Sequence, residues 1–489
     1  MAPNSIHVKR TSTILHPDQS RVLLRAFNPG DHERTTRIIE RILALPELQV
    51  VGLLDEIAAD FSKRHKEISK VFLERFEEVR DLLAPDENIS ERRRLLIGAY
   101  LVREFSLESA ALFNPSIVPH PDQSNLPCGS LRFILSLRAT GEGHVSSITF
   151  RTGVIHPDHR IEVHTPTGFL AEPQEIPNPL YEKALFERKL SEVGLGNDFV
   201  LRVMNKLGES FTLEELRTNL EFEVNQFHLS DGMVQEHQSL AQGIWMLARS
   251  NYEVQFQPDQ EFSERVIFPA TASQSNGIED ARFVDFQNDD GTHIYYATFT
   301  AFDGKVVFPE LVETSDFLLF RFITLNGAAA ENKGMAIFPR KINGLYAMLG
   351  RQDNENIYLM FSDNVHFWNE CQVLLKPKFP WELIQLGNCG SPIETPAGWL
   401  VLSHGVGPMR KYCIGAFLLD RDNPAKVLGR LREPLLKPDE NEREGYVPNV
   451  VYTCGALLHQ GELIIPYGLS DRATGFATVR LDEVLAAMC

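Results

Sequence analysis

The chain has 489 residues, 43% of them hydrophobic and 23% charged, a composition typical of a globular protein that is too long for one ordinary core. It carries 48 Lys and Arg against 66 Asp and Glu, and the net charge of −18 argues against nucleic acid or an anionic membrane as its main partner. An anion-binding site in this chain must therefore be a local cluster of cations.

The cysteines and the N-terminal segment argue for a reduced protein without a metal. The six cysteines are scattered and form no C-x-x-C pair, so neither a zinc site nor a disulfide framework is predicted. Residues 1–20 lack the apolar core of a signal peptide, and no apolar run approaches the length of a membrane span. We therefore expect a cytoplasmic location.

The first predicted elements are helices. Between His32 and about Leu83, apolar residues recur at helical spacing and predict amphipathic helices. Residues 84–90 break this pattern, with Ser90 as a candidate N-cap, and residues 91–105 predict a further helix. We expect residues 1–107 to form an N-terminal α-helical module. Its apolar faces would pack on the rest of the chain or on a second subunit of a homo-oligomer.

From residue 108 onward, short strands separated by turns replace the helices. In a recurring phrase, a glycine turn is followed by a hydrophobic strand and a polar or charged residue, at 129–138, 291–301, 344–351, 398–405 and 461–468. The last four glycines are 53, 54 and 63 residues apart, a period typical of propeller blades. Five instances predict a mainly-β fold, a five-bladed β-propeller over residues 108–489.

A much longer stretch separates the first two instances of the phrase. Its pattern is helical from about residue 177 to residue 223. We interpret this stretch as a helical insertion between strands of the early blades. It would serve as a packing surface for the N-terminal helices or as a lid over the site.

Charged and polar residues stand at equivalent ends of the repeated strands. If these strands line the central channel, their ends converge at its mouth, with Glu279, Asp280 and Arg282 in the second blade. The other residues at strand ends are Arg138, Arg351, His404 and the segment 467–471. Each has a structural explanation when taken singly, such as an ion pair between blades. Interior positions are normally apolar, so the group as a whole predicts a site for anionic or sugar chemistry.

Six longer segments are more specific than the repeat itself. They are GIEDARFV, NKGMAIFPRKINGLYAMLGR, GSPIETPAGWLVLSHGV, YCIGAFLLDRDNPAKVLGR, EREGYVPNVVY and PYGLSDRATGFA. Together these segments resemble glycoside hydrolase family 130, the family of mannoside phosphorylases. The resemblance runs in order from ALFNPSIV near Phe113 to the C-terminus, interrupted mainly by the helical insertion.

This resemblance implies a five-bladed propeller that cleaves β-mannosides with inversion. In the phosphorylases of such a family, inorganic phosphate attacks the anomeric carbon, and α-mannose 1-phosphate and an acceptor sugar are released. The resemblance makes Asp280 the proton donor, acting through the 3-hydroxyl group of the bound mannose. Ala281 stands where many members have proline, which leaves the carboxylate in place.

The residues that would hold phosphate also follow from the resemblance. An inverting hydrolase needs a second carboxylate as base, whereas an anionic nucleophile needs cations that hold it beside the sugar. The resemblance assigns charge-assisted hydrogen bonds to phosphate to Lys333, Arg351 and His404. Gln385 departs from the family pattern, which often has lysine there, and Arg410 is the residue that could compensate.

The resemblance also implies a set of residues that bind the mannose. Amide, guanidinium and carboxylate groups suit a ring of hydroxyls, and the matching residues are Asn114, Arg138, Arg282, Tyr412 and Asp471. Arg282 is equally expected to be an ion-pair partner that orients Asp280. Glu279 is expected on the opposite face of the strand, because neighbouring residues alternate. The tryptophans at the propeller turns are assigned to structure rather than to sugar stacking: Trp368, Trp381 and Trp399.

Three functions stay open from the sequence. Phosphorolysis of β-mannosides ranks first, because none of the phosphate positions has become a carboxylate. An inverting β-mannosidase that uses water ranks second, and a non-catalytic propeller that binds glycans is the third. The first function requires no cofactor, with inorganic phosphate as co-substrate beside the β-mannoside.

Overall fold

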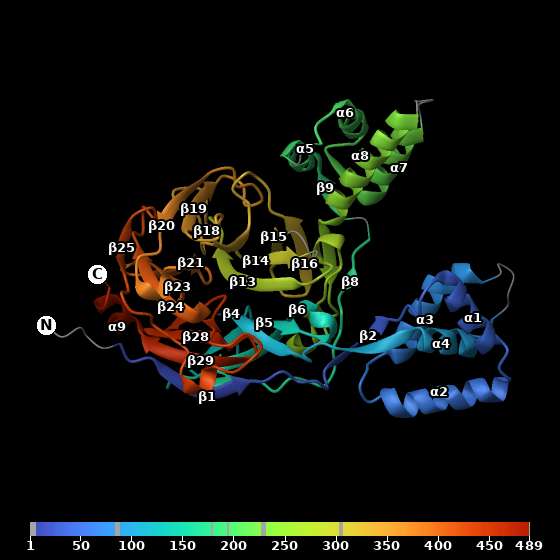
Figure 1. Ribbon diagram of the computed structural model, residues 1–489, viewed down its shortest axis with the longest axis horizontal. Helices are drawn as coiled ribbons and strands as arrows, with labels where there is room; N and C mark the ends of the chain where they lie inside the picture. The colour runs from blue at the N-terminus through green and yellow to red at the C-terminus, as the bar shows by residue number, and fades with distance from the viewer. Residues whose placement is uncertain are drawn as a thin grey trace.

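The computed structural model describes residues 6–83, 89–177, 179–192, 195–225, 231–302 and 307–488, so part of the predicted break at 84–90 lies outside the described residues. The expected mainly-β architecture is confirmed, because strands dominate the chain from residue 102 onward. Five antiparallel sheets of four to six strands lie around a common centre (Figure 1).

Each large sheet is built mostly from consecutive strands. The first two contain β4 (Ala111–Pro119), β5 (Leu131–Thr140), β6 (Ser146–Ile155), β7 (Ile161–Val163) and β12 (Val266–Ile267), and then β13 (Ile278–Gln287), β14 (His293–Phe302), β15 (Val307–Thr314), β16 (Leu319–Thr324), β11 (Tyr252–Gln255) and β8 (Gln174–Glu175). The next two contain β17 (Lys333–Ile337), β18 (Tyr346–Arg351), β19 (Ile357–Ser362) and β20 (Cys371–Leu375), and then β21 (Gln385–Asn388), β22 (Ile393–Thr395), β23 (Gly398–Gly407), β24 (Lys411–Leu419) and β25 (Val427–Arg430).

The fifth sheet joins the two ends of the described chain. Its strands are β26 (Val451–Tyr452), β27 (Leu457–His459), β28 (Glu462–Leu469), β29 (Ala473–Arg480) and β1 (Lys9–Leu15). Strand β1 pairs antiparallel with β29, whose strand is followed by helix α9 (Leu481–Ala486). Residues 9–15, which the sequence analysis placed in the helical module, therefore belong to a sheet.

The repeated phrases form the second strand of each large sheet, not the innermost one. They coincide with β5, β14, β18, β23 and β28, and each of these pairs with an edge strand: β4, β13, β17, β21 and β26. The edge strands β4 and β13 contact each other between sheets, as do β17 and β21. The prediction that the repeated strands line the centre was therefore wrong: the edge strand next to each of them lies there instead.

Helices form two groups outside the sheets. The first contains α1 (His32–Leu43), α2 (Glu47–Phe61), α3 (Ile68–Val79) and α4 (Glu91–Tyr100), with the short pair β2 (Val22–Ala26) and β3 (Val102–Ser106). Ser90 caps α4 as expected, accepting a hydrogen bond from the Arg93 amide at 3.3 Å. The helix ends earlier than predicted, because residues 102–106 pair with β2 instead.

The second group lies in the predicted insertion and extends beyond it. It contains α5 (Lys183–Glu192), α6 (Asp198–Asn205), α7 (Leu213–Asn225) and α8 (Asp231–Arg249), with the pair β9 (Leu180–Glu182) and β10 (Ser210–Thr212). Helix α8 follows the residues that the sequence pattern had identified as helical. Figure 1 shows both helical groups projecting from the same side of the ring of sheets.

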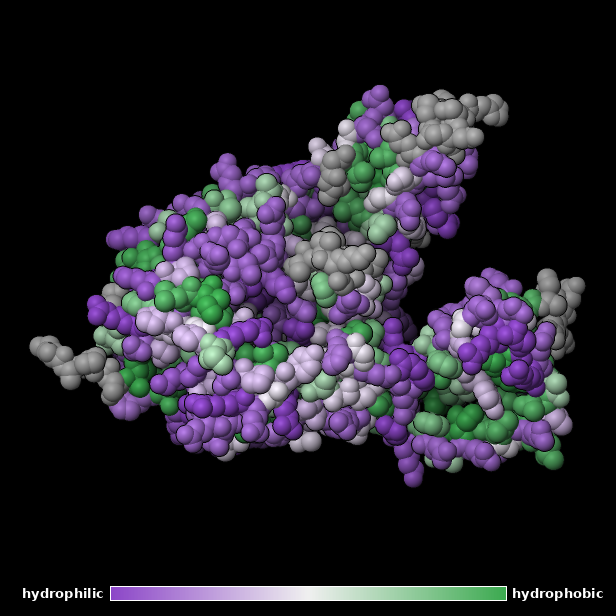
Figure 2. Space-filling model, viewed as in Figure 1, coloured by the Kyte–Doolittle hydropathy of each residue, from purple (hydrophilic) through white to green (hydrophobic). Residues whose placement is uncertain are grey.

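The surface differs between the ring and the first helical group. Figure 2 shows hydrophilic residues around the middle of the ring and hydrophobic residues gathered on the group that contains α2. Leu48 of α2 is 85% exposed. No helix among the described residues combines the length and the apolar character that crossing a membrane requires.

The tryptophans of the sheets have structural surroundings, as expected. Trp368 and Trp399 are fully buried. The ring of Trp381 covers Gly405 and Gly415, where an added Cβ would lie 2.4 Å from ring atoms. Glycine at these positions lets the indole lie flat against the fourth sheet.

One carboxyl group is buried in the second sheet without a cation. Glu310 on β15 is fully buried and accepts hydrogen bonds from Ser273 Oγ at 2.9 Å and Gln274 Nε2 at 2.8 Å. Burial raises the pKa of Glu310 to about 7, because hydrogen bonds from neutral groups compensate only part of the lost hydration. These contacts hold the segment that leads into β13.

We expect Glu310→Gln to remove part of the pH dependence of stability. The folded protein retains the Glu310 proton up to about pH 7, whereas the unfolded chain loses it near 4.5, so the wild-type free energy of unfolding should fall by about 3 kcal/mol as pH rises through this window. Urea unfolding at pH 5 and pH 8 would measure this effect: relative to the wild type, the free energy of unfolding of the variant should be higher at pH 8 than at pH 5. If the free energies of unfolding of the variant and the wild type differed by the same amount at both pH values, Glu310 would not be a buried neutral acid.

Candidate active site

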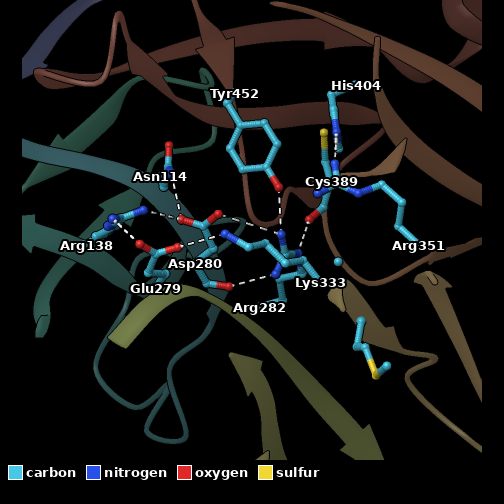
Figure 3. Close-up of polar contacts among 12 residues, drawn as sticks. Asn114, Arg138, Glu279, Asp280, Arg282, Lys333, Arg351, Cys389, His404 and Tyr452 are labelled. Atoms are coloured by element: carbon cyan, nitrogen blue, oxygen red, sulfur yellow. Dashed lines mark hydrogen bonds and ion pairs between the residues drawn. The ribbon is translucent and has the colours of Figure 1, made fainter. Parts of the chain in front are cut away.

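The predicted site residues lie at the same end of the five large sheets. Asn114, Asp280, Lys333 and Gln385 are on the edge strands β4, β13, β17 and β21. Strand register brings residues of the second strands beside them: Phe113 pairs with Arg138, Lys333 with Arg351, and Gly387 with His404. The sheets therefore converge their charged residues on one region, shown in Figure 3.

Irregular backbone at the strand ends aims these side chains. Asn114 and Asp280 have positive φ angles of 47° and 55°, and the register shifts around each of them. A bulge interrupts the alternation of side chains and redirects them. As a result Glu279 and Asp280 both face the site, and the expectation that Glu279 lies on the opposite face was wrong.

Asp280 lies among groups that stabilise its ionised form. Its Oδ1 accepts hydrogen bonds from Asn114 Nδ2 at 2.7 Å and Arg138 Nη1 at 3.3 Å, and Arg282 Nη2 lies 4.0 Å from its Oδ2 (Figure 3). Burial alone would raise the pKa of Asp280, but the charges of Arg138 and Arg282 and the Asn114 bond together hold it below its ordinary value. The carboxyl group is therefore ionised in this state.

Arg282 hydrogen-bonds to protein groups that surround the site. It is 3% exposed and donates to the Cys389 carbonyl at 2.8 Å, the Asp280 carbonyl at 2.9 Å and the Tyr452 hydroxyl at 2.6 Å. These contacts favour the role of orienting Asp280 over that of binding a sugar hydroxyl. Tyr452 and Cys389 were not singled out from the sequence, although Tyr452 ends the segment EREGYVPNVVY.

Glu279 joins two cations of the site. Its Oε1 accepts from Arg138 Nη2 at 2.7 Å and its Oε2 from Lys333 Nζ at 3.2 Å. Arg138 is also fixed by a bond from its Nε to Ser146 Oγ at 2.9 Å. The sequence analysis had placed Arg138 and Lys333 in separate groups, for sugar and for phosphate, and the structure connects them through Glu279.

Arg351, His404 and Gln385 form a second cluster. Arg351 Nη1 lies 2.8 Å from His404 Nε2, which must accept because a guanidinium only donates. With its amide oxygen turned toward Arg351, Gln385 accepts from Arg351 Nε at 3.2 Å. Glycine at 387 permits this packing, since an added Cβ would lie 2.4 Å from the imidazole.

The imidazole of His404 is neutral. Burial, followed by the charges of Arg351 and Arg282, lowers the pKa of His404 well below its ordinary value. His404 thus brings no positive charge to an anion, which differs from the charge-assisted contact expected from the sequence. Its one ring proton lies on the buried Nδ1, because Nε2 accepts from Arg351.

Aromatic rings and a second aspartate complete the site. The ring of Tyr412 stacks on that of His404 at 6.0 Å, and Tyr452 meets the same imidazole edge-on at 5.1 Å, so Tyr452 connects the two clusters. Asp471 lies on a tight turn with a φ angle of 52°. Burial and the charge of Asp280 raise the pKa of Asp471 to about 7, against the opposing charges of Arg138 and Arg410.

The assembled site suits an anion beside a polyhydroxylated ligand. The site contains four cations beside the two acidic residues Glu279 and Asp280: Arg138, Arg282, Lys333 and Arg351. Local positive charge is what an anion needs in a chain with a net charge of −18. Within the described ranges, no group of three or more His, Cys, Asp or Glu could hold a metal ion.

Comparison with known proteins gives consistent matches. The family described as beta-1,4-mannooligosaccharide phosphorylase matches residues 233–489. The chain is 34% identical over 225 residues to a 1,2-beta-oligomannan phosphorylase of Thermoanaerobacter sp. (strain X514), covering 44% of this chain and 72% of that protein. It is 33% identical over 227 residues to a beta-1,2-mannobiose phosphorylase of Listeria innocua, covering 45% and 62%.

A solved structure is also similar. The beta-1,2-mannobiose phosphorylase from Listeria innocua, in complex with beta-1,2-mannobiose, aligns with a TM-score of 0.46 and 23% identity, over 78% of this chain and 93% of that one. The family match covers more than half of the chain and includes Asp280, Lys333, Arg351 and His404. The chain belongs to glycoside hydrolase family 130.

Proposed function

We propose that this protein cleaves β-mannosides by inverting phosphorolysis, releasing α-mannose 1-phosphate and an acceptor sugar. The observation that carries the proposal is the pair Lys333 and Arg351, in register on β17 and β18, in the same site as the Asp280 carboxylate. The names of the relatives, all phosphorylases of mannosides, support the same activity. The reaction needs no cofactor, and phosphate is a co-substrate.

The proposal includes a division of the chain. The five large sheets would be the blades of a β-propeller, with residues 108–489 as the catalytic domain and the second helical group as an insertion in it. Apart from β1, which belongs to the fifth sheet, residues 1–107 would form an accessory module that supplies an interface to a second copy of the chain. The exposed hydrophobic residues on the group that contains α2 support this assignment.

Each step of the proposed reaction has residues suited to it. Asn114, Arg138 and Asp471 would hydrogen-bond the hydroxyls of the mannose, and Lys333, Arg351 and neutral His404 would hold phosphate. Phosphate oxygen forms a bond to the anomeric carbon as the glycosidic bond breaks on the opposite face. The departing oxygen takes a proton that originates on Asp280 and is relayed by the 3-hydroxyl group of the mannose.

Phosphate would also prepare Asp280 for this role. In the described state Arg138 and Arg282 hold the pKa of Asp280 below its ordinary value. An incoming phosphate dianion adds negative charge close to Asp280 and offsets those cations, so it raises the pKa of the carboxyl group. Binding of the nucleophile and protonation of the acid would therefore be coupled.

One observation bears on the hydrolytic alternative. Glu279 supplies a second carboxylate in the site, as an inverting hydrolase would require of its base. Both of its oxygens are already engaged, by Arg138 and by Lys333. Glu279 would have to give up one of these cations before it could contact an attacking water, and this favours phosphorolysis.

The test is product analysis with and without phosphate. The protein would be incubated with β-1,2- and β-1,4-mannobiose in phosphate and in phosphate-free buffer. We expect mannose 1-phosphate in the first and almost no cleavage in the second. Free mannose formed at equal rates in both buffers would identify a hydrolase, and no product from any β-mannoside would favour a binding protein.

A further inference from the structure

Glu279 occupies an unexpected position for an acidic residue. It contacts Lys333, one of the two cations proposed to hold phosphate, and it also contacts Arg138, which bonds to Asp280 (Figure 3). The side chain of Glu279 is 18% exposed and that of Lys333 is 36% exposed, so the ion pair lies at the accessible side of the cluster. An anion that approaches Lys333 therefore meets Glu279 as well.

A carboxylate in this place works against phosphate. Like charges separated by a few ångströms in a partly buried site repel strongly, so Glu279 opposes a phosphate dianion that is held by Lys333. The ion pair must also be broken or stretched before Lys333 can turn fully to phosphate. The ammonium group is a compact charge on a flexible stem, which allows such an exchange of partners.

Arg138 behaves differently from Lys333 in this cluster. Its guanidinium is fixed by three partners, Glu279, Asp280 and Ser146. Glu279 can thus release Lys333 and still remain anchored by its bond of 2.7 Å to Arg138. The arrangement has one firm contact and one contact of 3.2 Å that can be exchanged.

We propose that Glu279 is an internal counter-ion that holds Lys333 in the free enzyme and yields it to phosphate. It is a positioning residue that acts through Lys333, and its charge sets the affinity for phosphate. The inference rests on the proposed phosphorolysis. It adds that Glu279 competes with phosphate, the proposed nucleophile, for Lys333.

The first experiment removes the charge and keeps the shape. Glu279→Gln can still accept a hydrogen bond from Arg138, but it no longer repels phosphate. We expect the KM for phosphate and its Kd from calorimetry with inorganic phosphate to fall about tenfold, as the loss of about 1.4 kcal/mol of repulsion would produce. The KM for the mannoside should change less than threefold, because Arg138 keeps its partners.

A matched control separates this effect from the change in net charge. Glu142 lies on the turn between β5 and β6, at the same end of the first sheet, and pairs with Arg103 at 2.7 Å outside the site. Glu142→Gln changes the charge of the protein equally and should leave the phosphate affinity unchanged. A similar fall in both variants would overturn the proposal.

A double-mutant cycle tests the route through Lys333. In the Lys333→Met background the additional change Glu279→Gln should improve phosphate binding by less than in the wild type, because it relieves only the direct repulsion and no ion pair remains to be released. Glu279→Asp, which shortens the side chain, should show an intermediate gain and serves if the glutamine variant does not fold. Parallel shifts of both KM values would indicate a purely structural role and contradict the proposal.

The outcome for the wild type keeps the two proposals distinguishable. Phosphate-dependent cleavage with unchanged phosphate affinity in Glu279→Gln would refute the counter-ion and leave phosphorolysis intact. Cleavage that ignores phosphate would refute both.

Discussion

Asp280→Asn should lower kcat by about 10³-fold, the range in which removal of a general acid usually falls. The asparagine oxygen can still accept from Asn114 and Arg138, as the carboxylate does, so binding of the mannoside should persist. Only the proton that reaches the departing oxygen is lost. Formation of mannose 1-phosphate and calorimetric binding of a mannobiose would measure the two effects separately.

A control on the same strand sharpens this test. Asp285 also lies on β13 but pairs with His293 at 2.8 Å, away from the site cluster. Asp285→Asn should retain wild-type turnover. If Asp280→Asn kept its kcat, or lost binding of the sugar together with turnover, Asp280 would not be the proton donor.

Arg351→Met should raise the KM for phosphate by about 30- to 150-fold, since a hydrogen bond to a charged group contributes about 2–3 kcal/mol. The variant loses a cation and the donor to His404, while Lys333 remains. The KM for the mannoside should change little. The same loss of charge should raise the pKa of His404, because Arg351 is one of the cations that lower it.

Lys341 offers the comparison for this substitution. It follows β17 at the far end of the third sheet and pairs with Asp289 at 3.1 Å. Lys341→Met should leave both KM values near those of the wild type. An unchanged KM for phosphate in Arg351→Met would show that Arg351 does not bind phosphate. It would thereby contradict the role of the Lys333–Arg351 pair on which the proposed phosphorolysis rests.

The repeat and the clustering of charges were predictable from the sequence for physical reasons. Glycine turns before hydrophobic strands are local signals. A period of 53–54 residues can be read directly from the sequence, because it does not depend on how the strands pack. Strands of one sheet bring residues at equivalent ends together, so Arg138, Arg351 and His404 could be grouped without coordinates. The sequence did not reveal whether the repeat lies on the edge strand or on the second strand of each sheet, because both strands are hydrophobic.

The details of the site depended on tertiary structure. The face that Glu279 adopts follows from a bulge and from the positive φ of Asp280, which alternation cannot reveal. The neutral state of His404 follows from burial beside Arg351 and Arg282. Gln385 looked like a loss of charge in the sequence, whereas in the structure its amide orients Arg351.

Pairing of β1 with β29 has a consequence for how the protein is made. Lys9 lies opposite Thr478, so β1 has no partner until β29, which is distant from it in the sequence, has been synthesised. Such non-local pairing slows folding, and the exposed backbone of a waiting strand invites association with other chains. The seven residues of β1 therefore stay open to contacts with other chains until β29 has been synthesised.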